Sequence, residues 1–215
     1  MVTTVLVVLL ASVLVRTFVV TPFSIPSGSM RETLDVGDRI LVDRLSYRLG
    51  PVHRGDVVVF DGTGSFVQET PSGENPVGVL LRGAAASLGL VEPAGSDFVK
   101  RVVGVGGDRV VCCDRRGRLE VNGAPVDEEY LYPGDRPSQV DFDIVVPDGT
   151  LWVMGDHRSK SRDSRDHLGR PGGGMVPVER VIGRVDWLGW PLDRLGSLEG
   201  NEAFTGIRPA DARHG

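Results

Sequence analysis

The sequence is poor in aromatic residues and in net positive charge, and it lacks the common metal-binding motifs. Aromatic side chains make up 6% of the 215 residues, so no surface for stacking nucleic-acid bases is evident. The formal net charge is -5 at pH 7 and the basic residues are scattered, which argues against a nucleic-acid partner. No Cys-x-x-Cys pair and no His-Glu-x-x-His motif occurs, so we expect no metal and no other cofactor.

Cysteine is also scarce, since the two present are the neighbours Cys112 and Cys113. Adjacent cysteines rarely bridge each other, because the geometry of such a disulfide is strained. We therefore expect two reduced, partly buried side chains on a strand, and these cysteines do not decide the compartment of the protein.

A long amphipathic helical pattern is absent beyond the first 20 residues. Short runs of branched apolar residues alternate with glycine-rich turns, and Asn122-Gly123 is a hairpin signal. We expect strands at residues 39–42, 57–60, 97–104, 109–113, 118–121, 143–146, 151–154 and 178–187. The predicted fold is mostly β, with an N-terminal transmembrane helix followed by an all-β domain of short antiparallel strands.

The first part of the chain is an almost wholly apolar run over residues 2–20, in which Arg16 is the only charge. Its length is close to the ~20 residues that cross a bilayer as a helix. A cleaved secretory signal is the alternative, but the run lacks a basic start and a small-x-small site before Pro22. We favour an uncleaved anchor over residues 1–20, whose orientation the flanking charges leave undetermined.

The remaining chain divides by composition into three parts. Residues 21–188 form the β-rich domain, and residues 61–96 within it are rich in Gly, Pro, Ser and Ala, as in an inserted surface loop. Residues 79–90 of this insert predict a short helix, which rests on the membrane surface or on the protein. Residues 189–215 form a polar, frayed C-terminal tail.

Three polar motifs interrupt the apolar pattern. In residues 26–30, Pro-Ser-Gly-Ser-Met, the glycine permits a tight bend and two serines could serve as nucleophile and hydrogen-bond donor. Alone, this is ordinary loop chemistry. Lys100 stands inside an apolar strand, and residues 155–165 form a dense polar loop that suits an internal hydrogen-bond network.

Together, residues 15–34, 99–108 and 154–165 resemble the type I signal peptidases, which are membrane-anchored serine proteases that cut signal peptides from exported preproteins. The turn and strand at residues 37–42 also fit. The resemblance covers roughly residues 10–188, so residues 21–188 would be the catalytic domain.

The resemblance implies a serine–lysine dyad in which Ser29 is the nucleophile and Lys100 the general base. A lysine can take a proton only when neutral, and burial among apolar groups lowers its pKa. Strand alternation puts Phe98, Lys100 and Val102 on one face, which allows such a setting. Without the resemblance, an exposed lysine on an edge strand would be the simpler interpretation.

The same resemblance implies roles for further residues. The Ser29 amide and the Ser27 hydroxyl would form the oxyanion hole. Ser161 and Asp163 would orient the lysine, and Asp156 and Arg165 would be structural supports of the loop. A pocket that admits only a small residue before the cut would be lined by Ile25, Met30, Leu34 and Val99.

Some positions depart from the family pattern. Glu32 stands where proline is frequent, which loosens the turn after Met30. His157 replaces a frequent asparagine, and we interpret it as a residue that bonds within its loop. The aromatic-glycine pair that often follows the third motif is replaced by residues 166–169, Asp-His-Leu-Gly.

The expected function is that of a membrane-anchored serine endopeptidase that removes signal peptides after small-x-small sites. Its partners would be the signal peptides of secreted preproteins and the lipid bilayer, and we expect a monomer. The chain would cross the bacterial cell membrane once, with the catalytic domain on the extracytoplasmic side.

Three other interpretations of the sequence are possible. A self-cleaving Ser-Lys protease related to the LexA-type repressors would need a DNA-binding helix-turn-helix, which the sequence does not contain. An anchored β-domain for binding or sensing would be an inactive relative. A Ser-His-Asp enzyme using His53 or His157 would lack the usual Gly-x-Ser-x-Gly turn.

Overall fold

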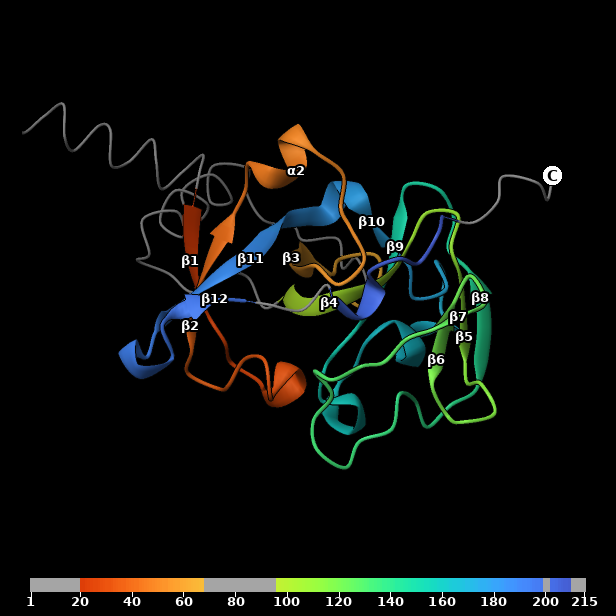
Figure 1. Ribbon diagram of the computed structural model, residues 1–215. Helices are drawn as coiled ribbons and strands as arrows, with labels where there is room; N and C mark the ends of the chain where they lie inside the picture. The colour runs from red at the N-terminus through yellow and green to blue at the C-terminus, as the bar shows by residue number, and fades with distance from the viewer. Residues whose placement is uncertain (1–19, 68–95, 199–201, 210–215) are drawn as a thin grey trace, which may run out of the picture.

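The computed structural model describes residues 20–67, 96–198 and 202–209. Within these ranges the chain forms two antiparallel β-sheets, connected by turns and very short helices (Figure 1). The prediction of a mostly β fold is therefore confirmed.

The larger sheet carries the segments that lead into the candidate site. Its strands are β1 (Val20–Ser24), β2 (Arg39–Asp43), β3 (Val57–Asp61), β4 (Asp97–Val105), β9 (Thr150–Met154), β10 (Val176–Pro177), β11 (Val181–Trp190) and β12 (Gly196–Ser197). Their order is β1-β2-β11-β3-β4-β9-β10, and β12 pairs with β11. Strand β4 thus lies inside the sheet between β3 and β9, and the valine-rich sequences of these strands suit a buried position.

The smaller sheet has the order β7-β6-β5-β8. Its strands are β5 (Arg109–Cys112), β6 (Leu119–Val121), β7 (Ala124–Pro125) and β8 (Phe142–Val145). The predicted hairpin at Asn122-Gly123 is confirmed, because Val121 pairs with Ala124 and both turn residues have positive φ, 53° and 76°.

The structure corrects the start of the last long strand and adds strand β1, which the sequence did not predict. The last long strand begins at Val181 rather than at residue 178, because residues 178–180 form the single-turn helix η4 (Val178–Arg180) that follows Pro177. Strand β1 was not predicted, since its five residues VTPFS contain a proline. Among the described residues it pairs only with β2, and such an edge position tolerates proline.

The short helices mark the loops between strands. They are η1 (Gly28–Met30), α2 (Ser46–Leu49), η2 (Arg158–Lys160), η3 (Ser164–His167), η5 (Leu192–Arg194) and η6 (Glu202–Phe204), in addition to η4. Helix η1 packs on an apolar cluster whose fully buried members are Ile25, Met30, Leu34, Ile40, Val42, Val57, Val59, Val185 and Leu188. This cluster fixes the segment that carries Ser29 against the larger sheet.

Two sequence predictions fall largely outside the described residues. Residues 1–19 of the predicted anchor and residues 68–95 of the predicted insert, including its helix at 79–90, are not described. In the parts of the chain that the structure describes, no helix has the length and apolar character needed to span a membrane.

Part of the predicted C-terminal tail belongs to the folded domain. Strand β11 continues to Trp190, and β12 pairs with it. Phe204 is 5% exposed in the apolar cluster beneath the smaller sheet, and Arg54 donates a hydrogen bond to the Ile207 carbonyl. Apolar side chains within this polar segment explain why residues 189–198 and 202–209 pack on the domain rather than fray.

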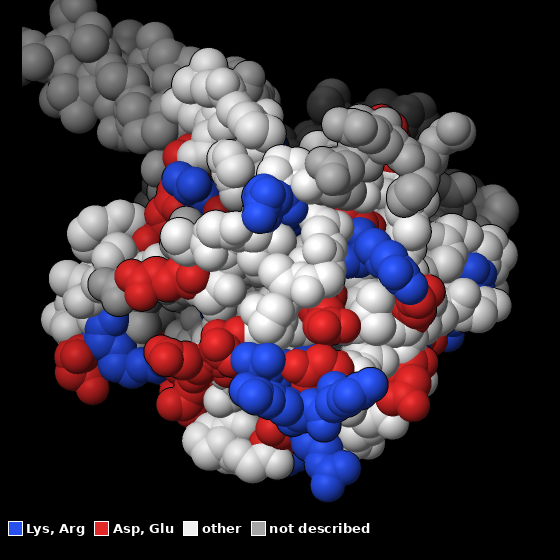
Figure 2. All heavy atoms as spheres, turned by 45° about the vertical axis from the view of Figure 1, so that its right-hand side comes forward, with Lys and Arg blue, Asp and Glu red and all other residues white. Residues whose placement is uncertain are grey.

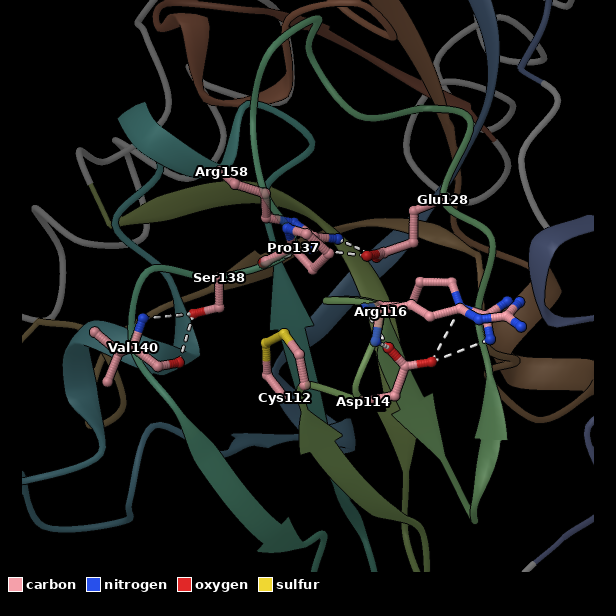
Figure 3. The surroundings of a disulfide bond; sticks show 10 residues. Cys112, Asp114, Arg116, Glu128, Pro137, Ser138, Val140 and Arg158 are labelled. Atoms are coloured by element: carbon pink, nitrogen blue, oxygen red, sulfur yellow. Dashed lines mark hydrogen bonds and ion pairs between the residues drawn. A yellow bond between two sulfur atoms is a disulfide. The ribbon is translucent and has the colours of Figure 1, made fainter.

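The prediction of two reduced cysteines was wrong. Cys112 and Cys113 are joined by a disulfide at the end of β5 (Figure 3). Consecutive side chains of a regular strand point to opposite faces, but the peptide bond between these residues is cis and brings their Cα atoms to 2.9 Å. The spacing of the residues in the sequence gives no sign of this local conformation.

Charged side chains of both signs share the face shown in Figure 2, where basic residues lie beside acidic ones. Many of the arginines are engaged in ion pairs, such as Arg109 with Asp143 and Arg118 with Asp114 and Asp127. Arg109 at the start of β5 and Arg118 just before β6 are therefore paired with neighbouring carboxylates.

Candidate active site

The segment that carries Ser29 is held by apolar residues on both sides of it. Ile25 and Met30 are buried, and the chain turns twice between them and Leu34, with hydrogen bonds from Arg31 N to Gly28 O and from Leu34 N to Met30 O. Met30 thus anchors η1 in the core. Ser29, which precedes it, is 8% exposed and faces β4.

The structure brings Ser29 and Lys100 into direct contact. The Lys100 Nζ atom lies 2.7 Å from Ser29 Oγ and 3.0 Å from the Val99 carbonyl oxygen. Ser27, which is exposed, places its hydroxyl 3.4 Å from Ser29 Oγ. Two serine hydroxyls and a buried lysine amine therefore share one site.

Burial favours the neutral form of the Lys100 amine, which is the form that can act as a base. Lys100 lies on the interior strand β4, where it pairs with Val58 of β3, and the residue is 3% exposed. Burial lowers the pKa of Lys100 to about 8, although the negative charges of Asp163 and Asp156 act in the opposite direction. A fraction of the lysine is therefore neutral near neutral pH and can accept the serine proton.

The loop after β9 brings Asp163 and Arg165 together behind this pair. Asp163 accepts hydrogen bonds from Gly155 N at 3.0 Å and from Arg165 Nε and Nη2, both at 2.8 Å. Burial raises the pKa of Asp163, but the bonds and positive charge of Arg165 outweigh it and leave the pKa below its usual value. Asp163 is thus an anion whose field acts on Lys100.

Ser161 lies beside the pair but does not bond to it. Its hydroxyl oxygen is buried close to the Asp163 carboxylate, whose pKa it helps to lower. It lies against the Cα of Gly155, next to the Ser29 carbonyl, so Ser161 fills the space that a side chain at position 155 would need. Its predicted role in orienting the lysine stays a prediction.

Alanine at position 155 is expected to lower kcat about a hundredfold. The new Cβ would clash with the Ser161 hydroxyl and lie 2.5 Å from the Ser29 carbonyl oxygen, so the nucleophile segment would have to shift by a fraction of an ångström or more. Single-turnover cleavage measures the effect. Gly169→Ala is the matched control, because no atom lies within 4 Å of the added Cβ, and a kcat equal to wild type in both variants would contradict this packing.

A buried ion pair joins strand β4 to the loop after β9. Arg101 donates to both carboxylate oxygens of Asp156, at 2.9 and 2.7 Å, and the two side chains are 1% and 0% exposed. Thr33 donates its hydroxyl to the same carboxylate. Arg101 was missed in the sequence, although a basic residue within an apolar central strand signals a buried partner.

The four residues of the expected substrate pocket lie in one apolar cluster. Ile25, Met30 and Leu34 are buried in it, and Val99 packs against it while remaining partly exposed. The cluster lies next to Ser29 in the chain through Met30 and next to Lys100 through Val99. Of the four residues only Val99 is partly exposed, so the substrate pocket stays a prediction.

The two histidines weighed as alternative bases do not reach the nucleophile. His53 is exposed and lies 3.9 Å from Asp56, and the His157 ring contacts the Gly28 carbonyl oxygen at 3.2 Å. Neither ring bonds to Ser29 Oγ within the described residues. A Ser-His-Asp arrangement is therefore not formed here.

Comparisons with known proteins agree in pointing to one family. Residues 1–190 match the family described as signal peptidase, peptidase S26. The chain is 39% identical over 210 residues to a probable signal peptidase I of Mycobacterium leprae, covering 85% of this chain and 72% of that protein. It is 41% identical over 201 residues to signal peptidase I of Mycobacterium tuberculosis, covering 84% and 68%. Signal peptidase I of Leptolyngbya laminosa is 35% identical over 184 residues, covering 86% and 75%.

Proposed function

Since this chain belongs to the signal peptidase family, peptidase S26, we propose that Ser29 and Lys100 are its catalytic serine and lysine. The protein is a serine endopeptidase that removes signal peptides. The assignment of these two residues rests on the 2.7 Å contact between Lys100 Nζ and Ser29 Oγ, both of which are buried.

In the proposed reaction Lys100 accepts and releases a proton twice, once in each half of the reaction. Neutral Lys100 takes the Ser29 proton while Oγ attacks the carbonyl carbon of the scissile peptide bond. The lysine then gives that proton to the leaving amine of the mature protein, and the signal peptide remains as an ester on Ser29. A water molecule attacks the ester with Lys100 as base, and the proton returns to Ser29 as the signal peptide leaves.

The developing negative charge on the carbonyl oxygen needs donors already in place. The Ser29 amide and the Ser27 hydroxyl would supply them, and the 3.4 Å separation of the two serine hydroxyls supports this assignment. The buried carboxylate of Asp163 would then offset the charge of the lysine after it takes the proton, with Arg165 holding that carboxylate in place.

Cleavage after small-x-small sites would follow from the apolar cluster around Met30 and Val99. Branched and bulky side chains there leave room for a small residue before the cut and exclude larger ones by steric clash. Residues 1–20 would anchor the enzyme as a single span, with the catalytic domain outside the cytoplasm and the chain working as a monomer. The apolar run ends where β1 begins at Val20, which would hold the site close to the bilayer.

The pH dependence of cleavage tests the lysine assignment. Only the neutral amine accepts a proton, so kcat/KM is expected to rise about tenfold per pH unit below the Lys100 pKa of about 8 and to level off above it. The assay uses purified enzyme and a preprotein whose products are identified by mass spectrometry. A kcat/KM that is flat from pH 6 to pH 9 would contradict the proposal.

The rise of kcat/KM up to about pH 8, the acid limb, must also be distinguished from the titration of a second group. Burial, together with the charge of Asp61, raises the pKa of Asp97 to about 6, so this carboxyl also titrates in the measured range. The Asp97→Asn variant is therefore the matched control, and it is expected to keep the limb near pH 8. Loss of the limb in this variant would assign it to Asp97 instead.

A further inference from the structure

The His157 side chain contacts the peptide group between Gly28 and Ser29. His157 places Nδ1 3.2 Å from the Gly28 carbonyl oxygen, which also accepts a 3.3 Å hydrogen bond from Arg31 N. The backbone N–H of His157 donates to the Ser29 carbonyl oxygen at 3.1 Å. His157 thus contacts the carbonyl groups on both sides of the nucleophile's Cα.

The first of these contacts bears on the oxyanion hole. In a trans peptide the carbonyl and the N–H point in opposite directions within one plane, so fixing the Gly28 carbonyl also fixes the direction of the Ser29 N–H. A hydrogen bond donated to that carbonyl additionally polarises the peptide group and strengthens its N–H as a donor. We propose that His157 is a positioning residue that orients and polarises the Ser29 amide toward the developing oxyanion.

The imidazole is well held for this role. It is stacked on the Tyr132 ring with centroids 3.9 Å apart and planes 14° apart, and His157 is 4% exposed. Tyr132 is itself fixed, because its N–H donates to the Asp156 carbonyl oxygen at 3.1 Å. Since a carbonyl only accepts, Nδ1 must carry the proton in this contact.

This inference rests on the proposed function, because it assigns a purpose to the Ser29 amide. It adds a residue whose side chain touches neither the serine hydroxyl nor the lysine in the described structure. It also explains how a histidine can stand at this position without acting as a base: only the nitrogen bonded to its Cγ is used.

Three substitutions at position 157 separate this role from simple packing. In His157→Asn the amide nitrogen takes the place of Nδ1, so kcat is expected within about threefold of wild type, since one hydrogen bond is kept. His157→Gln carries the same amide one carbon farther out and cannot repeat the contact. We expect His157→Gln and His157→Ala to lower kcat about ten- to a hundredfold with little change in KM, somewhat less than the loss of an oxyanion donor itself.

Two further readouts exclude a merely structural effect. The acid limb of kcat/KM is expected to stay near pH 8 in all three variants, because Lys100 is untouched. A peptide aldehyde with small residues at the cleavage positions adds to Ser29 Oγ, and the new alkoxide occupies the oxyanion hole. The affinity of the enzyme for this aldehyde is expected to fall in the Ala and Gln variants by about the same factor as kcat. Its affinity for the matching product peptide is expected to stay unchanged.

Some outcomes would overturn the inference. Wild-type kcat in His157→Ala would do so, as would an equal loss of affinity for the aldehyde and for the product peptide. If the Ala variant fails to fold, the Asn and Gln variants decide, since equal kcat in both would show that the Nδ1 contact is not used. Cleavage that survives in Ser29→Ala would instead remove the proposed function itself, so the two failures are distinguishable.

Discussion

Replacing Ser29 or Lys100 with alanine is expected to lower kcat/KM by at least about four orders of magnitude, the scale on which nucleophile and base variants of serine proteases fall. Ser29→Ala removes the atom that attacks the carbonyl. Lys100→Ala leaves the hydroxyl without the 2.7 Å partner that would take its proton. Preprotein cleavage by matched amounts of folded enzyme measures both losses.

The double variant and two surface controls make this result specific. Residues that act as one unit are not additive, so the Ser29→Ala/Lys100→Ala enzyme is expected to be no slower than either single variant. Ser24→Ala and Lys160→Ala, which change the same residue types at exposed positions, should retain wild-type rates. Full turnover in Lys100→Ala would assign the base to another residue.

Replacing Arg101 with methionine is expected to lower the free energy of unfolding by about 3–5 kcal/mol. The substitution leaves the Asp156 carboxylate, whose side chain is 0% exposed, without its only described ionic partner at hydrogen-bond distance. It also removes the guanidinium that stacks over the Tyr130 ring at 4.0 Å. Urea denaturation of the variant and the wild type measures the change.

A surface pair in the same protein is the control. Arg109 also bonds both oxygens of an aspartate, Asp143, but the two side chains are 61% and 51% exposed. Arg109→Met is therefore expected to leave the free energy of unfolding nearly unchanged, because solvent screens an exposed pair. Equal losses in the Arg101 and Arg109 variants would contradict the claim that burial decides the effect.

Removing both partners of the buried pair gives a further check. In Arg101→Met/Asp156→Leu no charge is left without a partner, so much of the lost stability should return. Activity is expected to stay low, because the contact between Thr33 and the Asp156 carboxylate, which ties the nucleophile segment to the loop after β9, is lost.

The sequence predicts the β architecture well because its signals are local. Branched runs interrupted by glycine identify β3 and β4 within a residue of their ends, and Asn122-Gly123 identifies a hairpin from two residues. The pairing of Arg101 with Asp156 joins residues 55 positions apart, and no local pattern connects them. The disulfide at Cys112 depends on a peptide conformation that residue identity alone does not reveal.

In the candidate site, too, some features can be predicted from the sequence and others depend on packing between distant segments. Ser29 and Lys100 were found together only through the resemblance, since a serine loop and a strand lysine 71 positions apart are each unremarkable alone. The burial that lowers the lysine pKa, and the contact of His157 with the Gly28 carbonyl, come from packing between distant segments.

The pKa of Lys100 is the quantity on which the proposed mechanism depends, and NMR can measure it directly. The sequence contains only two lysines, Lys100 and Lys160, so protein labelled with 13C at the lysine Cε gives two signals. A Lys160→Arg variant assigns them. The Ser29→Ala variant is a useful second sample, because burial rather than the serine hydroxyl is the main cause of the lowered Lys100 pKa.

In this titration the Lys100 signal is expected to shift with a midpoint near pH 8, in the wild type and in Ser29→Ala. That midpoint, together with an acid limb of kcat/KM at the same pH, would identify Lys100 as the group that must be neutral for cleavage. A Lys100 signal that remains that of an ammonium ion up to pH 10 would contradict a lysine base, and Ser29 would need another partner.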